Sequence, residues 1–380
     1  MPHSPVIATL AELVRINSIN TAYPGGPGEA AVADYVRRFF RERGLETWDQ
    51  EVFPGRPNVI ARVPGRQPGR RVVFEAHTDT VTVAGMTIPP FEPTIADGRL
   101  HGRGSCDDKG GLAAMMHALA SLKNDGIVPP CEIWLCAAVD EEHSYRGVVK
   151  LCEGLTGAAA VVAEPTEMRV VITSKGVLRW KLISRGRAAH SSKPHLGVNA
   201  IAHMARVILA FEQDHQRLAA TTHPLLGCAT ANVGLITGGV QVNFVPDQCA
   251  IEVDRRLLPG ERAADVLAGY QRLLDELKAA HPTFDVEMQP PRVVDESLAT
   301  PADAAPVRVA SAILRELGLN PEPAGVPFGS DASKLSRQGL PSILFGPGSI
   351  DRAHAAVEYV ECDQVEQASE FYRRFMVGFE

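Results

Sequence analysis

Side chains that commonly bind metal ions follow the ends of four short apolar segments in this sequence. Residues 71–76, 131–139, 158–163 and 341–346 are nearly all apolar, as in strands buried on both faces of a parallel sheet. Ligands bind beyond the carboxyl ends of the strands in such sheets, so we expect the side chains found there to converge. They are His77 with Asp79, the triplet Asp140, Glu141 and Glu142, then Glu164, and His354 in a loop after the last segment.

Each of these segments, taken alone, has an ordinary structural explanation. A His-x-Asp tripeptide is usually incidental, an acidic triplet is usually a solvated surface run, and Glu-Pro is usually a turn. The ordinary explanation weakens because it needs a separate coincidence at each strand end. Carboxylates placed directly after buried strands are also costly unless they are paired or metal-bound. The sequence therefore predicts a cluster of carboxylates and histidines at one edge of the sheet, and these groups are either paired with one another or bound to metal.

A fifth segment, HGRGSCDDKG at residues 101–110, places two adjacent aspartates before a predicted helix. Residues 111–123 are rich in Ala, Met and Leu, which favour a helix, and Gly126 follows its end. Asp107 or Asp108 could simply cap this helix, because a helix N-terminus favours negative charge. Capping and metal binding both remain open for this pair on local grounds.

The order of the predicted elements indicates an α/β fold class, with a mostly parallel-sheet catalytic domain and an inserted domain. We expect the catalytic domain at residues 1–176 and 289–380, and the insertion at residues 177–288. The insertion follows the order βαββαβ, which is the ferredoxin-like α+β pattern. Its segments are residues 178–184, 199–212, 229–236, 248–257, 263–280 and 283–288. Helices are also expected at residues 363–377 and at the N-terminus, where Ile7, Leu10, Leu13 and Val14 share one face.

Nine motifs, in this order, resemble those of one enzyme family. They are HTDTV, GRGSCDDKGG, VDEEHSYRG, VVAEPT, RAAHSSKPHLGVNAI, QVNFVPD, VDRRLLPG, FGSDASKL and FGPGSIDRAHAAVEY. The family is that of the dinuclear zinc amidohydrolases and metallopeptidases, which includes acetylornithine deacetylase, succinyl-diaminopimelate desuccinylase, aminoacylase and glutamate carboxypeptidase. The resemblance runs from about residue 55 to the C-terminus, and the last motif is closest to the acetylornithine deacetylase branch.

The resemblance implies a site for two zinc ions. It assigns His77 and Glu164 to one ion, Glu142 and His354 to the other, and Asp107 to both as a bridge. Imidazole nitrogen and carboxylate oxygen are suitable zinc ligands. The same mixed ligands also accept cobalt or manganese.

The resemblance further implies how this site would act on a substrate. Asp79 would hydrogen-bond the second ring nitrogen of His77, and Glu141 would be the general base. His190 would stabilise an oxyanion, often in the partner subunit's site, and Asn243 and Arg256 would hold a substrate carboxylate. Local sequence does not distinguish Glu141 from Glu142, and His190 or Arg256 could equally be surface residues. Glu358 is a weaker candidate for a supporting role beside His354.

The implied reaction is hydrolysis of the amide bond of an N-acyl amino acid, as in acetylornithine deacetylase. A dipeptidase, a carboxypeptidase or a succinyl-diaminopimelate desuccinylase is an alternative, and so is a non-catalytic relative that binds an amino-acid-like ligand. Glu141 favours an enzyme, because a binding protein has no need of a base. The partner is then a small N-acyl amino acid or a short peptide, and the insertion is expected to act as a lid and to form a homodimer.

The bulk composition excludes several other classes of function. The 380 residues carry a net charge of -7 and no long basic run, so no nucleic-acid partner is expected. No apolar run reaches the roughly 20 residues of a membrane span. The seven cysteines form no Cys-x-x-Cys pair, which indicates free thiols, and we expect a cytoplasmic protein. A glycine pattern at residues 26–31 is no dinucleotide site, because no strand precedes it.

Overall fold

The computed structural model describes residues 4–380, and the chain divides into two compact units. The first unit comprises residues 1–172, 299–324 and 330–380, and the second comprises residues 173–298 and 325–329. The predicted insertion at residues 177–288 falls inside the second unit.

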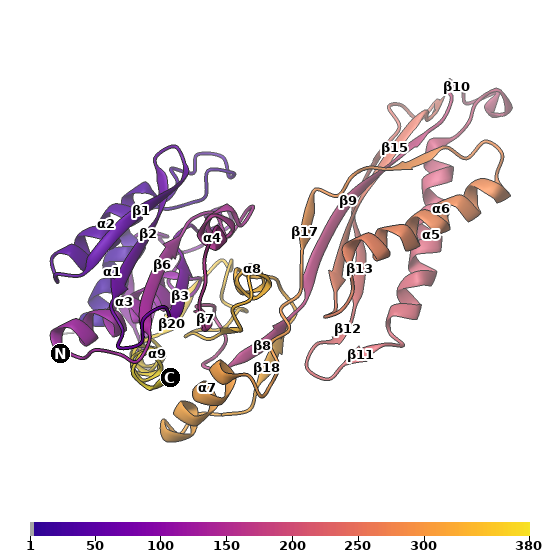
Figure 1. Ribbon diagram of the computed structural model, residues 1–380. Coiled ribbons are helices and arrows are strands. Elements are labelled where there is room, and N and C mark those ends of the chain that lie inside the picture. The colour runs from indigo at the N-terminus through magenta and orange to yellow at the C-terminus, as the bar shows by residue number, and fades with distance from the viewer. Residues whose placement is uncertain (1–3) are drawn as a thin grey trace. The chain divides into compact units, whose positions relative to one another are not determined.

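An eight-stranded sheet has the order β1-β2-β6-β3-β7-β19-β8-β18 (Figure 1). Its strands are β1 (Glu46–Phe53), β2 (Arg56–Val63), β3 (Arg71–His77), β6 (Glu132–Ala138), β7 (Ala159–Val162), β8 (Val171–Ser174), β18 (Ala324–Val326) and β19 (Ser342–Leu344). The four central strands β6, β3, β7 and β19 are mutually parallel. Strands β1, β2 and β8 pair in the antiparallel sense. This sheet confirms the predicted α/β fold class.

Helices cover both faces of this sheet. Ile133 and Leu135 point to the same face of β6, because alternate residues of a strand share a face. Both belong to one large core cluster. That cluster also contains residues of α1 (Pro5–Arg15), α2 (Ala30–Arg41), α3 (Lys109–Asn124), α7 (Ala305–Glu316) and α9 (Cys362–Gly378). The other face packs against α4 (Arg146–Cys152) and α8 (Ala332–Arg337). The four predicted residues of α1 are all at most 1% exposed, which confirms that helix and its buried face.

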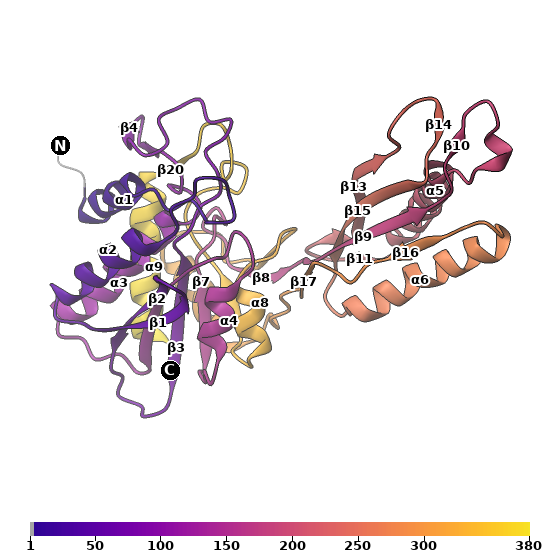
Figure 2. The same cartoon turned by 90° about the horizontal axis from the view of Figure 1, so that it is seen from above.

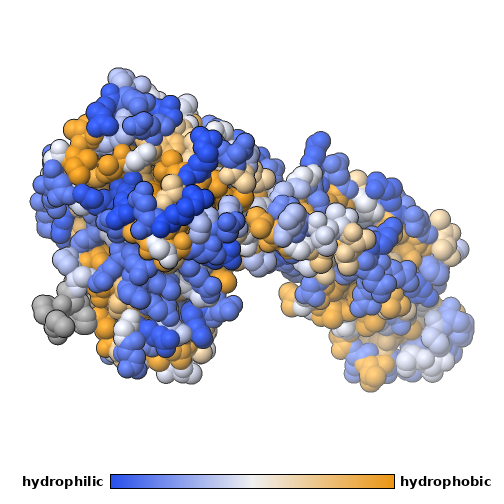
Figure 3. Space-filling model, turned by 90° about the horizontal axis from the view of Figure 1, so that it is seen from below, coloured by the Kyte–Doolittle hydropathy of each residue, from blue (hydrophilic) through white to orange (hydrophobic). Residues whose placement is uncertain are grey.

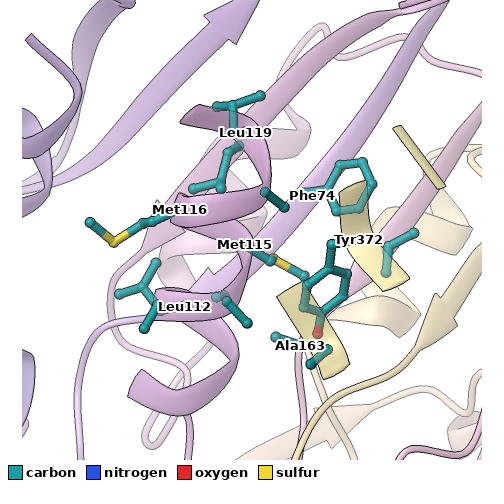
Figure 4. Packing of buried hydrophobic residues seen from close by; sticks show 14 of the residues in the cluster. Phe74, Leu112, Met115, Met116, Leu119, Ala163 and Tyr372 are labelled. Atoms are coloured by element: carbon teal, nitrogen blue, oxygen red, sulfur yellow. The ribbon is translucent and has the colours of Figure 1, made fainter. Parts of the chain in front are cut away.

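The interior around α3 is closely packed (Figure 4). Phe74 of β3 contacts the rings of Tyr372 and Phe375 of α9 edge-on, with centroids 6.0 and 5.9 Å apart. On α3, Met115 and Leu119 are fully buried in the same cluster. Burying each large apolar side chain stabilises the fold by about 1.5–3 kcal/mol. This packing fixes α3 against the sheet, and with it the loop that ends at Asp108.

The second unit contains a five-stranded antiparallel sheet, in which four strands follow the order β13-β15-β9-β16 and the fifth, β17 (Val293–Asp295), also pairs with β9 (Figure 2). The four strands are β9 (Gly176–Arg185), β13 (Thr230–Gly238), β15 (Gln248–Leu257) and β16 (Val286–Met288). Leu178, Trp180 and Leu182 of β9 pack against α5 (Ala200–Leu218) and α6 (Ala263–Ala280). The order β9-α5-β13-β15-α6-β16 confirms the predicted βαββαβ pattern.

Several short elements complete the chain. Strands β20 (Tyr359–Glu361), β5 (Arg99–His101) and β4 (Thr94–Ala96) form a small sheet in the first unit. In the second unit, β10 (Ala189–His190) pairs with β14 (Phe244–Val245), and β11 (Thr222–His223) pairs with β12 (Gly227–Cys228). A single 3-10 turn, η1 (Pro194–Leu196), follows β10.

The surface mixes hydrophilic and hydrophobic residues on the face seen in Figure 3. No helix within residues 4–380 is long and apolar enough to cross a membrane. The seven cysteines are all unpaired, as predicted.

Candidate metal centre

The parallel strands bring the predicted ligand residues to one edge of the sheet. His77 is the last residue of β3, Glu142 lies four residues after β6, and Glu164 lies two residues after β7. These strands and β19 are parallel neighbours, so their carboxyl ends coincide. The chain after β19 leads to His354, and Asp107 lies just before α3.

Asp107 lies between two histidines. Its Oδ1 is 3.0 Å from Nε2 of His77, and its Oδ2 is 3.2 Å from Nε2 of His354. The same nitrogen of His354 is 3.0 Å from Oε1 of Glu142. Ligand atoms of His77, Asp107 and Glu142 all lie within 4.8 Å of one another. Four of the five predicted metal ligands therefore form one contact chain, with Asp107 at its centre.

Glu164 is electrostatically part of the same cluster. The residue is 4% exposed. Burial raises the pKa of its carboxyl well above the usual range, and the negative charges of Glu141 and Asp107 raise this pKa further. Burial would also raise the pKa of Asp107, but the contacts with His354 and His77 lower it overall. The site thus holds several carboxylates with little water to solvate them.

The geometry around His77 fits a bound cation. Its Nδ1 is 3.0 Å from the main-chain oxygen of Asp79, and a carbonyl can only accept, so Nδ1 carries a proton. Burial would lower the pKa of His77, but its contacts with Asp107 and Asp79 raise that pKa well above the usual range, so Nε2 also carries a proton, which points toward Oδ1 of Asp107. A metal ion between Nε2 and Oδ1 would replace this proton, and fixing the tautomer through the far nitrogen is usual for metal-binding histidines. A donor set of imidazoles and carboxylates suits a divalent metal ion such as zinc, cobalt or manganese.

Asp79 contacts the predicted nitrogen of His77, but mainly through its main chain. Its Oδ1 is 3.6 Å from Nδ1 of His77, so the main-chain oxygen of Asp79, rather than its carboxylate, makes the short contact. The carboxylate instead accepts the main-chain N–H groups of Glu141 and Glu142, each at 3.1 Å. Asp140 has a φ of +70°, in the left-handed region, and the two amides that donate to Asp79 directly follow this turn. Asp79 therefore holds the backbone of the two glutamates.

Glu141 is a partly buried carboxylate near the cluster. Burial raises its pKa well above the usual range, the positive charge of His77 opposes this, and the charges of Asp331 and Glu142 add to it. A carboxylate with a raised pKa accepts a proton more readily at neutral pH. Its neighbour Glu142 differs, because that side chain contacts His354.

Glu358 binds the backbone at Asp107 and is itself paired with Arg103. Oε1 of Glu358 accepts the main-chain N–H groups of Cys106 and Asp107, at 3.0 and 3.2 Å. Its other oxygen forms a fully buried ion pair with Arg103. Sequence reasoning assigned Glu358 only a weak supporting role and missed Arg103. Asp108 is the N-cap residue of α3 but makes no side-chain capping bond, which argues against the capping explanation for that residue.

The predicted substrate-facing residues lie in the second unit. His190 pairs with Phe244 across β10 and β14, and Ser191 donates its N–H to the main-chain oxygen of Asn243 at 2.9 Å. His190 and Asn243 are therefore neighbours. Nδ1 of His190 accepts the N–H of Ser192 at 3.1 Å, so a neutral ring carries its proton on Nε2. Arg256 lies on β15, where its Nε donates to Asp254 at 2.8 Å.

Comparison with known proteins supports the same conclusion as the motifs. The profile of Peptidase family M20/M25/M40 matches residues 73–377. An acetylornithine deacetylase of Myxococcus xanthus is 30% identical over 98% of this chain and 97% of its own. The structure of aminopeptidase PepT from Bacillus cereus has a TM-score of 0.80, at 24% identity, over 98% of this chain and 97% of the other.

A second solved structure is that of the Bacillus subtilis protein YXEP, a dinuclear metal binding peptidase from the M20 family. It has a TM-score of 0.76 at 17% identity, and the match covers 98% of this chain and 96% of that chain. At these identities the two structures establish the fold. The family profile and the 30% identical relative confirm the resemblance seen in the motifs, and the chain belongs to Peptidase family M20/M25/M40, a family of hydrolytic enzymes.

Proposed function

We propose that this enzyme hydrolyses the amide bond of an N-acyl amino acid, in the manner of an acetylornithine deacetylase. The observation that carries the proposal is the cluster in which Asp107 lies between His77 and His354, with Glu141 beside it. The name of the 30% identical relative, which matches almost end to end, favours this substrate class over others.

The cluster would hold two zinc ions. His77 and Glu164 would bind one, Glu142 and His354 the other, and Asp107 both. The placement of one Asp107 oxygen against each histidine supports this assignment, as does the dinuclear metal binding of the Bacillus subtilis protein. When bound, such ions polarise the substrate carbonyl and lower the pKa of water. Cobalt or manganese could replace zinc with the same ligands.

The chain's own residues would then move the protons and hold the substrate. Glu141 would accept a proton from the attacking water and return it to the leaving amine. The N–H at Nε2 of His190 would donate a hydrogen bond to the oxygen that gains negative charge. Asn243 and Arg256 would hold the substrate carboxylate, for which the planar guanidinium is well suited.

A substrate panel tests the proposal. Zinc-loaded protein would be assayed against N-acetylornithine, N-succinyl-diaminopimelate, N-acylglutamate and a set of dipeptides. We expect the highest kcat/KM with N-acetylornithine or another N-acyl amino acid. A dipeptide or the succinyl compound as best substrate would instead identify a peptidase or a desuccinylase, which are the alternatives within the family. No turnover of any of them by metal-loaded protein would refute the proposal.

We also propose a homodimer formed through the second unit. Strand β13 lies at the end of the strand order of its sheet. Its residues Leu235 and Ile236 are 61% and 55% exposed, and Val240 and Val242, just after it, are almost fully exposed. An apolar edge strand favours pairing with another chain. Light scattering at micromolar concentration should give twice the mass of the 40.9 kDa chain, and a monomer would refute the dimer.

A further inference from the structure

Asn20 joins two buried carboxylates next to the candidate metal centre. Its Nδ2 donates to Oδ2 of Asp79 at 2.7 Å and to Oδ1 of Asp140 at 3.0 Å. Its Oδ1 accepts the N–H of Ala22 at 2.9 Å. Asn20, Asp79 and Asp140 are each at most 1% exposed. Both N–H donors of this amide and one lone pair of its oxygen are therefore used.

The chemistry of this position requires a primary amide. A carboxamide offers two N–H donors on one atom and an acceptor on the other, which matches two carboxylates and one main-chain N–H. An aspartate here would place a third negative charge against Asp79 and Asp140. An apolar residue would remove one donor from each of these buried carboxylates, which is costly.

Both carboxylates hold the segment that carries the two glutamates. Asp79 accepts the N–H groups of Glu141 and Glu142. Asp140 directly precedes them in a left-handed conformation, and its other oxygen accepts the hydroxyl of Ser144. Residues 140–142 are thus fixed from both sides, and Asn20 is the link between the two supports.

Asp140 is also tied to a second charged pair. Its N–H donates to Glu29 at 3.2 Å, and Glu29 is held by Nε of Arg56 at 2.5 Å. Arg56 approaches Asp140 less closely, at 3.5 Å. The guanidinium therefore mainly compensates Glu29, and Asn20 supplies the shorter contact to Asp140.

The segment around Asn20 is itself firmly placed. Thr80 exchanges main-chain hydrogen bonds with it, donating to Ser18 at 3.0 Å and accepting from Asn20 at 2.9 Å. Nζ of the buried Lys109 donates to the main-chain oxygen of Ile16 at 2.7 Å. We call residues 16–20 the strap. These bonds anchor the strap to Thr80 and Lys109, which lie close in sequence to His77 and Asp107.

We propose that Asn20 is a positioning residue that sets the backbone of Glu141 and Glu142 by joining Asp79 to Asp140. The inference rests on the proposed function for the roles of the two glutamates. Loss of the amide would displace one zinc ligand and the general base together, while the substrate-facing residues of the second unit stay unchanged. Supporting residues of this kind typically contribute 10–100-fold to metal affinity or activity.

The test compares Asn20→Ala and Asn20→Ser with Asn17→Ala. Asn17 lies on the same strap, and within residues 4–380 its side chain makes one hydrogen bond, accepting the N–H of Ile19, so it is a matched control. Zinc affinity would be measured by competition with a chelator, kcat and KM on the best substrate of the panel, and the melting temperature for each protein. We expect Asn20→Ala to weaken zinc binding and lower kcat by about 10–100-fold each, with KM changed less than about 3-fold. Asn20→Ser keeps one donor, so its zinc affinity and kcat should lie between those of Asn20→Ala and those of the wild type.

Three outcomes would overturn the inference. Asn20→Ala could retain the zinc affinity and kcat of the wild type, or Asn17→Ala could show the same losses. The third outcome applies if Asn20→Ala does not fold: an Asn20→Ser protein with unchanged zinc affinity and kcat would then overturn the inference. Because zinc affinity does not depend on turnover, an inactive wild type would count against the proposed function alone.

Discussion

At the scale of single residues, adjacent glutamates with the same chemistry have different surroundings. Burial raises the pKa of both carboxyls, but Glu142 also contacts His354, which lowers its pKa. Nothing in the local sequence separates the two, because both follow the same strand within an acidic triplet. The difference depends on the direction of each side chain after the turn at Asp140, which only the folded backbone determines.

Replacing Glu141 with alanine should abolish turnover and leave metal binding intact. The variant removes the proposed base but no ligand, so kcat should fall by about 10²–10⁴-fold. Metal content by atomic emission and kcat on the best substrate would be measured together. Glu153→Ala, which removes an exposed glutamate of an ion pair with Lys150, is the control and should change neither. Loss of metal from Glu141→Ala would mean that Glu141 is a ligand.

His190→Ala should lower kcat more than it raises KM. The reason is that a donor to the oxyanion acts in the transition state, and removing one costs about 10²–10³-fold in kcat. Steady-state kinetics on the best substrate would measure both constants. His195→Ala is the matched control, because His195 is an exposed histidine of the turn that follows β10. An unchanged kcat for His190→Ala would remove this residue from the oxyanion role.

At the scale of elements, the buried parallel strands and the larger helices were predictable, and the supports of the site were not. Continuous apolar runs identified β3, β6 and β7, because strands covered on both faces need no polar alternation. The hairpin of β1 and β2 and the small sheet containing β5 carry mixed patterns that do not stand out. The strap at residues 16–20 has no periodic signal, since its contacts with Asp79 and Lys109 come from distant segments.

The contact between α1 and α3 should make folding stability depend on pH through His117. Nε2 of His117 lies 2.8 Å from Oγ1 of Thr9, and its ring centroid is 5.3 Å from that of Phe39. Burial, and then the charge of Arg43, lowers the pKa of His117 to about 4. The unfolded chain, with a pKa near 6.5, therefore binds the proton first as pH falls. The contribution of His117 to the free energy of unfolding is fully present above about pH 6.5 and is lost as pH falls toward 4.

His117→Gln isolates this effect, because glutamine does not titrate in this range. The free energy of unfolding in urea would be measured for both proteins at pH 7.5 and pH 5. Between these values the wild type should lose on the order of 1–2 kcal/mol more than His117→Gln. Equal losses in the two proteins would mean that His117 has a similar pKa in the folded and unfolded states.

At the scale of the whole molecule, the proposed catalytic groups belong to different units of the chain. Glu141 and the ligand residues lie in the first unit, whereas His190, Asn243 and Arg256 lie in the second. If the proposed homodimer forms through the β13 edge, the His190 that serves each site belongs either to the same subunit or to its partner. Disrupting that edge should therefore reduce activity as well as mass if the histidine comes from the partner. Ile236→Lys should give monomers, while Val128→Lys, at an apolar position of the first unit that is 51% exposed, should not.

Mixing two inactive variants decides which subunit supplies His190. Glu141→Ala and His190→Ala protomers would be unfolded together in denaturant, refolded in equal amounts and assayed. Random pairing makes about half of the dimers mixed. If His190 acts in the partner subunit's site, each mixed dimer has one site with both residues intact, so about a quarter of wild-type activity should return. If His190 acts in its own subunit, every site lacks one residue and no activity returns.

The activity of refolded wild-type protein is the reference for this recovery, and the activity of each variant refolded alone is the background. Recovery would show that the complete active site exists only in the dimer, and its absence would make each chain catalytically self-sufficient.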